Sequence, residues 1–365
     1  MIRGYAEEPG SGRGARRRRG RWPLAVGGAM VTVFFLTAVF ADFLAPYDYR
    51  AQSRGEPQAP PAALRFRDAQ GTWRLRPVVS PRRLVDPLSR SYVEEAGRAY
   101  PLELFARGYS YRLCGIWVTD RHLFGVRGEA EAPRVYLLGT DGLGRDRLSR
   151  LIIGSRFSLL VGPLATALAS LIGILLGCFA GYGGRWADAA LMRAADVVMA
   201  LPTLVFILAA RAAFPPELPP ARAAALLVTI LVALGWAEMA RLTRGLVLEL
   251  REREFVQAAV SLGASPARIL LGHILPNAAR QLTAQALLVL PAFLLAETAL
   301  SFLGVGVQEP EASWGSLLAA AADTTLLARG HALALLAPAL AIALFVLGVR
   351  LLGGGVKQEA ESENC

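Results

Sequence analysis

Six stretches of this chain are long and apolar enough to cross a lipid bilayer, and no other feature constrains its fold as strongly. A transmembrane helix needs about 20 predominantly apolar residues, and hydrophobic residues make up 54% of the chain. Hydropathy places the stretches at residues 23–44, 158–181, 194–214, 223–240, 282–303 and 333–352. The sequence therefore predicts an all-α, polytopic membrane protein with about six transmembrane helices.

The N-terminal segment 1–21 is rich in glycine and arginine and ends in the run RRRRGR. It has no apolar periodicity, so we expect a disordered tail that the positive-inside rule keeps on the cytoplasmic side. A cleaved signal peptide is the alternative, because Val39, Phe40 and Ala41 form a passable cleavage site. The apolar run exceeds the usual h-region of about 7–15 residues, which favours a membrane anchor.

The short loops alternate in charge along the chain. Segments 182–193 and 241–280 carry several arginines, the turn 215–220 carries no basic residue, and segment 304–330 is more acidic than basic. This alternation predicts that both termini are cytoplasmic. The arginines of the long outer segment do not conflict with it, because loops beyond about 60 residues translocate largely regardless of charge. The predicted parts are a basic cytoplasmic tail (1–21), a first transmembrane helix (22–45), a large extracytoplasmic insert (46–156), a five-helix core (157–353) with a charged inner loop (241–280), and a cytoplasmic tail (354–365).

The inner loop contains an amphipathic helix. Its apolar residues Phe255, Ala258, Ala259 and Leu262 recur at i, i+3, i+4 and i+7, opposite a charged face. Such a structured segment, held in water between membrane spans, is expected to contact a partner.

A second short helix follows at once. Gly263 can take the left-handed conformation that ends a helix, and Ser265 followed by Pro266 is an N-cap with proline at the first helical position. The second helix, 266–274, should be separated from the fifth span by Pro276, which lacks a backbone N–H. We therefore expect a hairpin of two helices joined by an elbow at the membrane surface.

Two interpretations of this hairpin are open. A passive interfacial helix needs bulky apolar residues that bury in the headgroup region. The stripe instead contains the small residues Ala258 and Ala259, which permit close approach of another surface. Docking of a protein is therefore the favoured interpretation.

The sequence lacks the residues needed for ATP hydrolysis, for a metal site and for a disulfide framework. Lys357 is the only lysine among 39 basic residues and lacks a following Ser or Thr, so the sequence has no Walker A motif. His122, His273 and His331 fall in segments assigned to different sides of the membrane and cannot form one metal site. Three scattered cysteines are too few for a disulfide framework or a zinc site. We expect no catalytic residues, no cofactor, no metal and no nucleic acid.

Ionisable residues at the level of the spans are candidates for function. Glu297 lies in the middle of the fifth span, and a role in a transport pathway and a role as a buried, hydrogen-bonded packing residue are equally supported. Asp196, Arg211 and Glu238 lie near span ends, where snorkelling to the headgroups is the simpler interpretation.

The loop and three further motifs resemble a known family. The loop has two alanines, Ala258 and Ala259, then Gly263, and LP at Leu275 and Pro276. It resembles the permease subunits of binding-protein-dependent ABC importers, and the dipeptide, oligopeptide and nickel permease group in particular. The other matches are LGTDGLGRDRLSRLIIGSRFSLLVG at 138–162, GYGGRWADAALMRAADVVMALP at 181–202 and AETALSFLGVGVQEPEASWG at 296–315.

The resemblance covers the first span and nearly all of 138–353, whereas the insert at about 51–133 has no counterpart in the shorter family members. It implies an inner-membrane transport subunit, not an enzyme, that forms half of a pathway for peptides or similar small solutes, with nickel and sugars as alternatives. The implied partners are a second permease subunit in a heterodimer, two cytoplasmic ATPase subunits, an extracytoplasmic solute-binding protein and membrane lipid.

The resemblance further implies that the hairpin couples the chain to an ATPase. The family's loop usually begins with Glu where this chain has Gln257, and the wider importer pattern has Ile where this chain has His273. Glu254 lies one helical turn before Gln257 and could partly replace the missing carboxylate. The residues assigned to coupling are Glu254, Phe255, Gln257, Ala258, Ala259, Gly263, Pro266, Leu275 and Pro276.

A function of a different class is also compatible with the sequence. The chain could be a membrane-anchored sensor or assembly factor whose extracytoplasmic insert is the working domain. Adjacent genes for ATPases and a binding protein would favour import. A membrane enzyme, the third alternative, would need catalytic residues that the sequence does not show.

Overall fold

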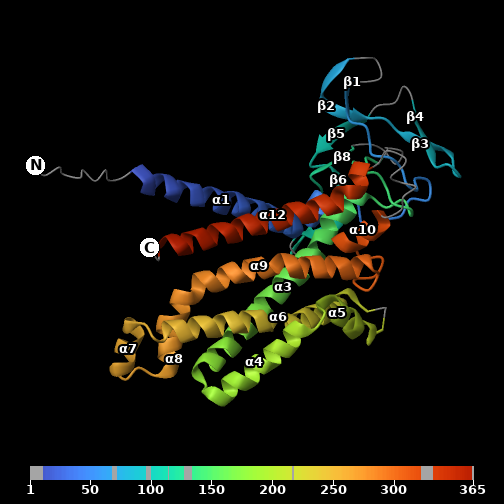
Figure 1. Cartoon of the computed structure of the whole chain (residues 1–365). Helices are drawn as coiled ribbons and strands as arrows, with labels where there is room; N and C mark the ends of the chain where they lie inside the picture. Colours follow the sequence, from blue (N-terminus) through green and yellow to red (C-terminus); the bar gives the residue numbers. More distant parts are fainter. Residues whose placement is uncertain are drawn as a thin grey trace, which may run out of the picture.

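The chain is described from a computed structural model that covers residues 11–67, 72–95, 100–113, 115–126, 134–215, 218–321 and 332–363. Long helices dominate it (Figure 1). Their bounds are α1 (Ser11–Val39), α2 (Ala41–Leu44), α3 (Arg147–Tyr182), α4 (Arg185–Ala200), α5 (Thr203–Ala212), α6 (Pro220–Leu250), α7 (Glu254–Ser261), α8 (Pro266–Ile269), the π-helical turn η1 (Leu270–Ile274), α9 (Leu275–Phe302), α10 (Trp314–Ala321) and α12 (Ala332–Glu363).

Within the described residues, five helices are long and apolar enough to span a membrane, and a bent pair makes a sixth candidate. The five spans lie in α1, α3, α6, the α8–α9 helix and α12. The prediction of a mostly helical, polytopic membrane protein with about six spans is therefore confirmed at this level.

The predicted third span, 194–214, is not one straight helix. It divides into the end of α4 and all of α5, which meet at an angle of 86°. Leu201 has an extended backbone (ψ 134°) at the break, immediately before Pro202. A proline disfavours helical geometry in the residue before it, which accounts for the position of the bend.

The bundle is held together by a close contact between α3 and α6. Three glycines spaced four residues apart, Gly173, Gly177 and Gly181, line the side of α3 that meets α6. A methyl group at Gly177 would lie 2.5 Å from the Ala240 carbonyl oxygen and 2.6 Å from Thr243 Cβ. Small residues at such positions let two helix backbones approach, which matters because lipid gives apolar helices little reason to associate.

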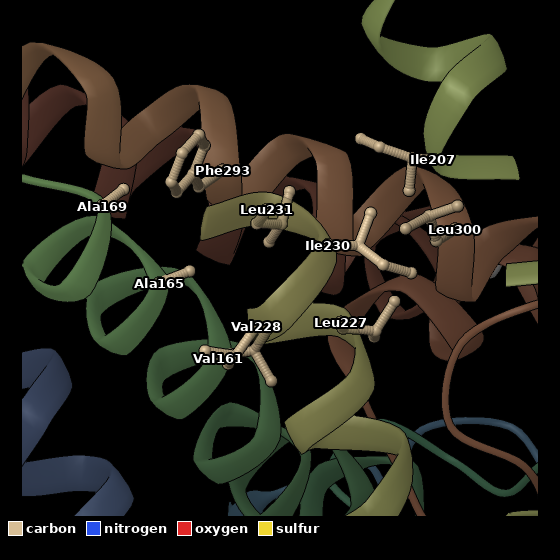
Figure 2. Packing of buried hydrophobic residues seen from close by; sticks show 10 residues of the cluster. All are labelled: Val161, Ala165, Ala169, Ile207, Leu227, Val228, Ile230, Leu231, Phe293 and Leu300. Atoms are coloured by element: carbon tan, nitrogen blue, oxygen red, sulfur yellow. The ribbon is translucent and has the colours of Figure 1, made fainter. Parts of the chain in front are cut away.

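Apolar side chains fill the space beside this contact (Figure 2). The cluster combines α3, α5, α6 and α9, so the bent α5 is anchored in the same core as the straight spans. Its buried members are Val161, Ala165, Ala169, Ile207, Leu227, Val228, Ile230, Leu231, Phe293 and Leu300.

The first and last spans pair with each other along one side of the bundle (Figure 1). Phe34 on α1 makes edge-on contacts with Phe345 on α12, at 5.6 Å between ring centroids, and with Trp314 on α10, at 5.8 Å. Trp314 and Phe345 are almost completely buried. These rings connect α1 and α12 to the rest of the core.

The prediction of an all-α protein is wrong for the segment between α2 and α3. This insert forms short antiparallel strands at one end of the bundle (Figure 1). The four-stranded sheet has the order β1-β2-β5-β8, and two further pairs are β3-β4 and β6-β7. The strands are β1 (Arg65–Arg67), β2 (Trp73–Val79), β3 (Arg82–Asp86), β4 (Ser91–Glu94), β5 (Tyr100–Leu104), β6 (Arg107–Leu113), β7 (Trp117–Arg121) and β8 (Phe124–Val126).

A buried histidine joins the insert to α2, which follows the first span. His122 is 1% exposed, and its two ring nitrogens lie 3.0 Å from the backbone oxygens of Asp42 in α2 and Tyr109 in β6. The backbone N–H of Leu123 also donates to the Phe43 carbonyl, at 2.8 Å. The insert is therefore attached to the membrane bundle at α2.

Replacing Gly177 with alanine should destabilise the bundle by about 1–3 kcal/mol, because the added methyl group overpacks the α3–α6 contact. Thermal unfolding of the purified protein in detergent would measure the loss. Gly245→Ala on α6 is the matched control, since a methyl group there meets nothing within 4 Å. Equal unfolding temperatures for the two variants would contradict the assignment of the contact.

Candidate functional site

The end of the bundle opposite the insert carries two short helices joined by a turn, α7 and α8 (Figure 1). Gly263 in the turn has a φ of 78°, a left-handed conformation that side chains with a Cβ rarely adopt. The Ser265 hydroxyl accepts the backbone N–H of Arg268 at 3.4 Å, and Pro266 stands at the start of α8. These are the local features that the residue pattern predicted.

One face of α7 is buried and the other is open. Val256 and Ala259 pack into a core formed with Cys178, Val247, Ile269 and Ile274. Three of the four stripe residues face the other way, since Phe255 and Ala258 are exposed and Leu262 is 88% exposed. Most of the predicted apolar stripe is therefore an outward surface, and the buried base of α7 is formed by Ala259 together with Val256, which the pattern did not include.

Polar contacts fasten α7 to the ends of α3 and α6. The Arg251 guanidinium donates to the Gly181 carbonyl of α3 at 3.2 Å. The Gln257 side-chain amide donates to the Arg251 carbonyl at 2.8 Å. The exposed Glu254 lies in the first turn of α7. Gln257 thus has a structural contact within the chain, while Glu254 faces solvent.

A second tie lies between α4 and α6. Arg244 forms a two-pronged ion pair with Asp188, and its Nη2 lies 2.5 Å from Oδ2. Arg241 on the same helix pairs with Asp196. Asp196, which we expected to snorkel, therefore bridges two helices.

Pro276 does not separate the second short helix from the fifth span. The π-helical turn η1 leads directly into α9, and the Leu275 N–H donates to the Leu270 carbonyl. Pro276 stands in the first turn of α9, directly after the π-helical turn. The Asn277 side chain donates to the His273 carbonyl at 2.6 Å. The chain changes direction here while remaining helical (Figure 1).

Glu297 is completely buried on α9. The Ser301 hydroxyl donates to its Oε1 at 2.8 Å, and its Oε2 has no hydrogen-bond partner within the described residues. Arg211 is also buried and donates to the carbonyl oxygens of Phe214 and Pro215, so it does not snorkel. Glu238 accepts from Gln285 at 2.7 Å.

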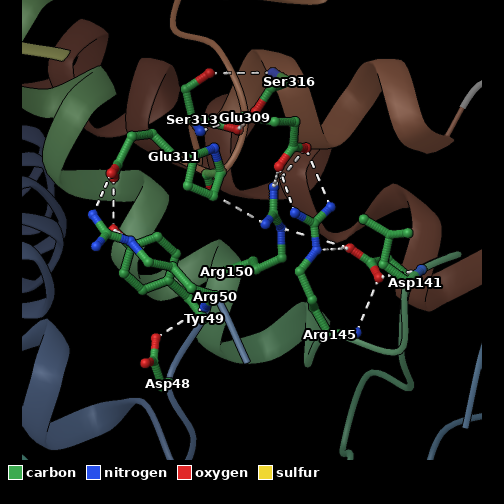
Figure 3. Close-up of polar contacts among 12 residues, drawn as sticks. Asp48, Tyr49, Arg50, Asp141, Arg145, Arg150, Glu309, Glu311, Ser313 and Ser316 are labelled. Carbon is green, nitrogen blue, oxygen red and sulfur yellow. Dashed lines mark hydrogen bonds and ion pairs between the residues drawn. The ribbon is translucent and has the colours of Figure 1, made fainter. Parts of the chain in front are cut away.

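The insert end carries a cluster of charges that sequence reasoning missed (Figure 3). Arg145 and Arg150 share the carboxylate of Glu309, with Arg145 Nη1 at 2.5 Å from Oε2 and Arg150 Nη2 at 3.0 Å from Oε1. Arg145 Nε also lies 2.7 Å from Asp141 Oδ2. The Arg150 side chain is 2% exposed. This cluster joins the turn before α3 to the loop between α9 and α10.

A second group of charges lies beside it. Arg50 pairs with Glu311, and the Tyr49 hydroxyl donates to Glu311 Oε2 at 2.6 Å (Figure 3). Burial, and then the bond to Glu311, raise the pKa of Tyr49 to about 12, so the hydroxyl keeps its proton at neutral pH. Glu309 and Glu311 both belong to the motif VGVQEPEASWG. Their ion-pair partners are too distant in the sequence to be identified from the sequence alone.

Asp146 caps the start of α3 from a buried position. Its Oδ2 accepts both the backbone N–H of Ser149, at 2.8 Å, and the Ser149 hydroxyl, at 2.6 Å. Burial raises the pKa of this carboxyl from 3.8 to about 6. The residue belongs to the GTDGLGRD motif, and its role here is helix capping.

With this geometry in place, comparison with known proteins decides the family. A family described as binding-protein-dependent transport system inner membrane component matches residues 173–358. The chain belongs to this family. A second match, the N-terminal TM domain of oligopeptide transport permease C, covers residues 14–61.

Several relatives bear related names. A putative peptide permease protein of Brucella suis is 39% identical over 219 residues, which are 60% of this chain and 70% of that protein. The oligopeptide transport system permease protein OppC of Mycobacterium tuberculosis is 36% identical over 220 residues, 60% of this chain and 73% of that protein. The dipeptide transport system permease protein DppC of Bacillus subtilis is 39% identical over 222 residues, 60% and 66% of the two chains.

The family identity confirms the predicted resemblance. The chain is a multi-pass inner-membrane permease subunit of an ATP-driven, binding-protein-dependent importer, and it is not itself an enzyme. As a member of the family it works with another permease, an ATPase and a binding protein. A sensor or assembly factor is not favoured.

Replacing Glu309 with glutamine should cost about 1–3 kcal/mol of stability, because two largely buried guanidinium groups lose their shared carboxylate. Thermal unfolding of the detergent-purified protein would measure this. Glu249→Gln is the matched control: the ion pair of Glu249 with Arg253 is about 60% exposed on both sides, and such pairs contribute about 1 kcal/mol or less. An equal loss in both variants would argue against a special role for the cluster.

Asp146 should give the protein a measurable pH dependence. Between pH 3.8 and about 6 the folded carboxyl holds a proton that the unfolded chain has released, so stability falls as pH rises through this window. Asp146→Asn should remove this contribution while keeping an oxygen for the Ser149 N–H. Unfolding temperatures of the variant and the parent should diverge in favour of the variant as pH rises from about 4 to about 6, and parallel profiles would contradict the assignment.

Proposed function

We propose that this permease carries peptides or similar small solutes and is coupled to its ATPase through the α7–α8 hairpin. The names of the relatives, which specify peptides, oligopeptides and dipeptides, support the solute class. The geometry of α7 is the observation that supports coupling through the hairpin. Its outward face presents exposed Phe255, Ala258 and Leu262, while Val256 and Ala259 fix its other face to the bundle.

The proposed docking site comprises one apolar surface and its polar border. The small, exposed Ala258 lets a partner surface come close, and exposed apolar groups on a water-facing segment are typical of protein contacts. Glu254 is placed at the border, where it can pair with a basic residue of the partner. The full set of residues proposed for coupling is Glu254, Phe255, Gln257, Ala258, Ala259, Gly263, Pro266, Leu275 and Pro276, of which Ala259 supports the surface from its buried side.

The proposed assembly has a second, related permease, two cytoplasmic ATPases and one extracytoplasmic binding protein. Both termini and segment 241–280 are assigned to the cytoplasm, and segment 46–156 to the outside. The alternating charge of the short loops supports this orientation. The position of the hairpin and the insert at opposite ends of the bundle supports it as well (Figure 1).

Coupling would be mechanical. Each ATPase has two conformations that bind nucleotide with different free energies. This difference can shift the conformation of the permease only through a contact between the two proteins that differs between the permease's own states. The hairpin is suited to this, because Arg251 ties it to α3 and the Val256 base ties it to α6. A displacement of α7 would therefore move both long spans together.

Glu297 is a candidate pathway residue in this proposal. Its buried carboxylate has one oxygen without a hydrogen-bond partner within the described residues, a costly arrangement that a second conformation can relieve.

Replacing Gly263 with valine should uncouple ATP hydrolysis from uptake, because a β-branched residue resists a φ of 78°. Peptide uptake and ATP hydrolysis would be measured in liposomes that contain the assembled transporter and its binding protein. We expect uptake to fall by about tenfold or more, at the lower end of typical coupling factors, while the transporter remains assembled and hydrolyses ATP.

Gly354→Val on α12 is the matched control, because a side chain at that position meets nothing within 4 Å and the backbone is helical. It should leave uptake unchanged. Normal uptake by the Gly263→Val transporter would count strongly against coupling through this hairpin.

A further inference from the structure

A cavity lies between the insert and the membrane spans and is lined by residues of both. Its volume is about 560 Å³, which is within the range of about 300–1,000 Å³ typical of small-molecule sites. The insert contributes Tyr109 and Ser110 from β6, and the bundle contributes α3 and the start of α6. Strand β6, which forms part of the cavity lining, lies at the end of the bundle opposite the α7–α8 hairpin (Figure 1).

Charges of both signs line this cavity. Arg50 and Arg156 supply two guanidinium groups, and their side chains are 54% and 39% exposed. Glu311, paired with Arg50, and Asp42, paired with Arg156 at 2.8 Å, supply two carboxylates. The Arg156 guanidinium also donates to the Ala38 carbonyl at 2.8 Å. The arginines are thus held in place by partners while part of each remains accessible.

Asp48 adds a carboxylate of a different kind. Its Oδ1 accepts the backbone N–H of Arg50 at 2.9 Å, and it forms no ion pair within the described part of the chain. The cavity therefore has a carboxylate available to a cation and two guanidinium groups available to an anion. Apolar residues, among them Ile153, Phe157 and Leu160, line the remaining wall.

This combination matches a short peptide with free ends. Such a molecule carries an ammonium group at one end, a carboxylate at the other and neutral side chains between them. A guanidinium group binds a carboxylate with paired N–H donors, and a carboxylate binds an ammonium group in the same charge-assisted way. A ligand of a single charge would use only half of the lining.

We propose that this cavity binds the solute as a zwitterionic short peptide, with Asp48 receiving its ammonium group and Arg50 and Arg156 receiving its carboxylate. The inference rests on the proposed function, since it takes the solute to be a peptide. It gives the insert a role, because β6 forms one wall of the site. The insert would then help to receive the solute before it enters the bundle.

Protection of a cysteine from a thiol reagent tests this directly. Ser110 is exposed and lines the cavity, so Ser110→Cys would be introduced into a chain whose three native cysteines are replaced by serine. The rate of maleimide labelling of the assembled transporter would be measured in the presence of tri-alanine, and in the presence of tri-alanine blocked at both ends by acetyl and amide groups. At about ten times its dissociation constant, tri-alanine should slow labelling about tenfold by mass action, and the blocked peptide should not.

Asp48→Asn should abolish the protection by tri-alanine while keeping an oxygen for the Arg50 N–H. Asp86→Asn in β3 is the matched control, because Asp86 likewise accepts a backbone N–H two residues on, at 2.9 Å, and is not among the residues that line the cavity. It should leave protection intact. Equal protection by the blocked peptide, or full protection in the Asp48→Asn transporter, would overturn the proposed site.

Uptake of tri-alanine by the same transporter separates this inference from the proposed function. Uptake without protection of Ser110→Cys would overturn the cavity proposal alone. Protection without uptake of any peptide would support a zwitterion site and overturn the proposal of peptide import.

Discussion

The close packing of α3 against α6 is the contact on which the rest of the structure depends. Gly173, Gly177 and Gly181 bring the two backbones together over the second half of α3. Because lipid is as apolar as the helix surfaces, this fit must come from van der Waals contact rather than from the exclusion of water. The core of Figure 2 forms beside it and includes the bent α5 and the long α9.

The same contact relates the two ends of the molecule. α3 begins just after Arg145 and contains Arg150, and both arginines hold the loop before α10 through Glu309. Near the other end of α3, the Gly181 carbonyl accepts from Arg251 beside the hairpin. The single helix α3 therefore contacts both the charge cluster around Glu309 and the region of the α7–α8 hairpin. In the proposed mechanism, a displacement applied at α7 would reach the charge cluster and the cavity through α3, without a chain of small side-chain movements.

The features that could be predicted from sequence are local ones. The six apolar windows identified the spans, and Gly263, Ser265 and Pro266 identified the turn between α7 and α8, because each depends on neighbouring residues alone. Features set by distant contacts were missed. Glu309 pairs with Arg145, which lies 164 residues earlier in the chain, and Val256, which is not part of the predicted stripe, is buried at the base of α7. The strands of the insert were missed because its prolines and aromatic residues gave no clear period, and the bend at Pro202 was hidden inside a continuous apolar run.

The central claim is that the outward face of α7 is a docking surface for the ATPase. The most direct test is cross-linking in the assembled transporter, using Leu262→Cys in a chain without native cysteines and a short bifunctional thiol reagent. Leu262 is 88% exposed on this face, whereas Trp117 in the insert is also exposed but lies at the opposite end. The account predicts a cross-link to the ATPase from Leu262→Cys and none from Trp117→Cys. A cross-link to the ATPase from Trp117→Cys alone would contradict it.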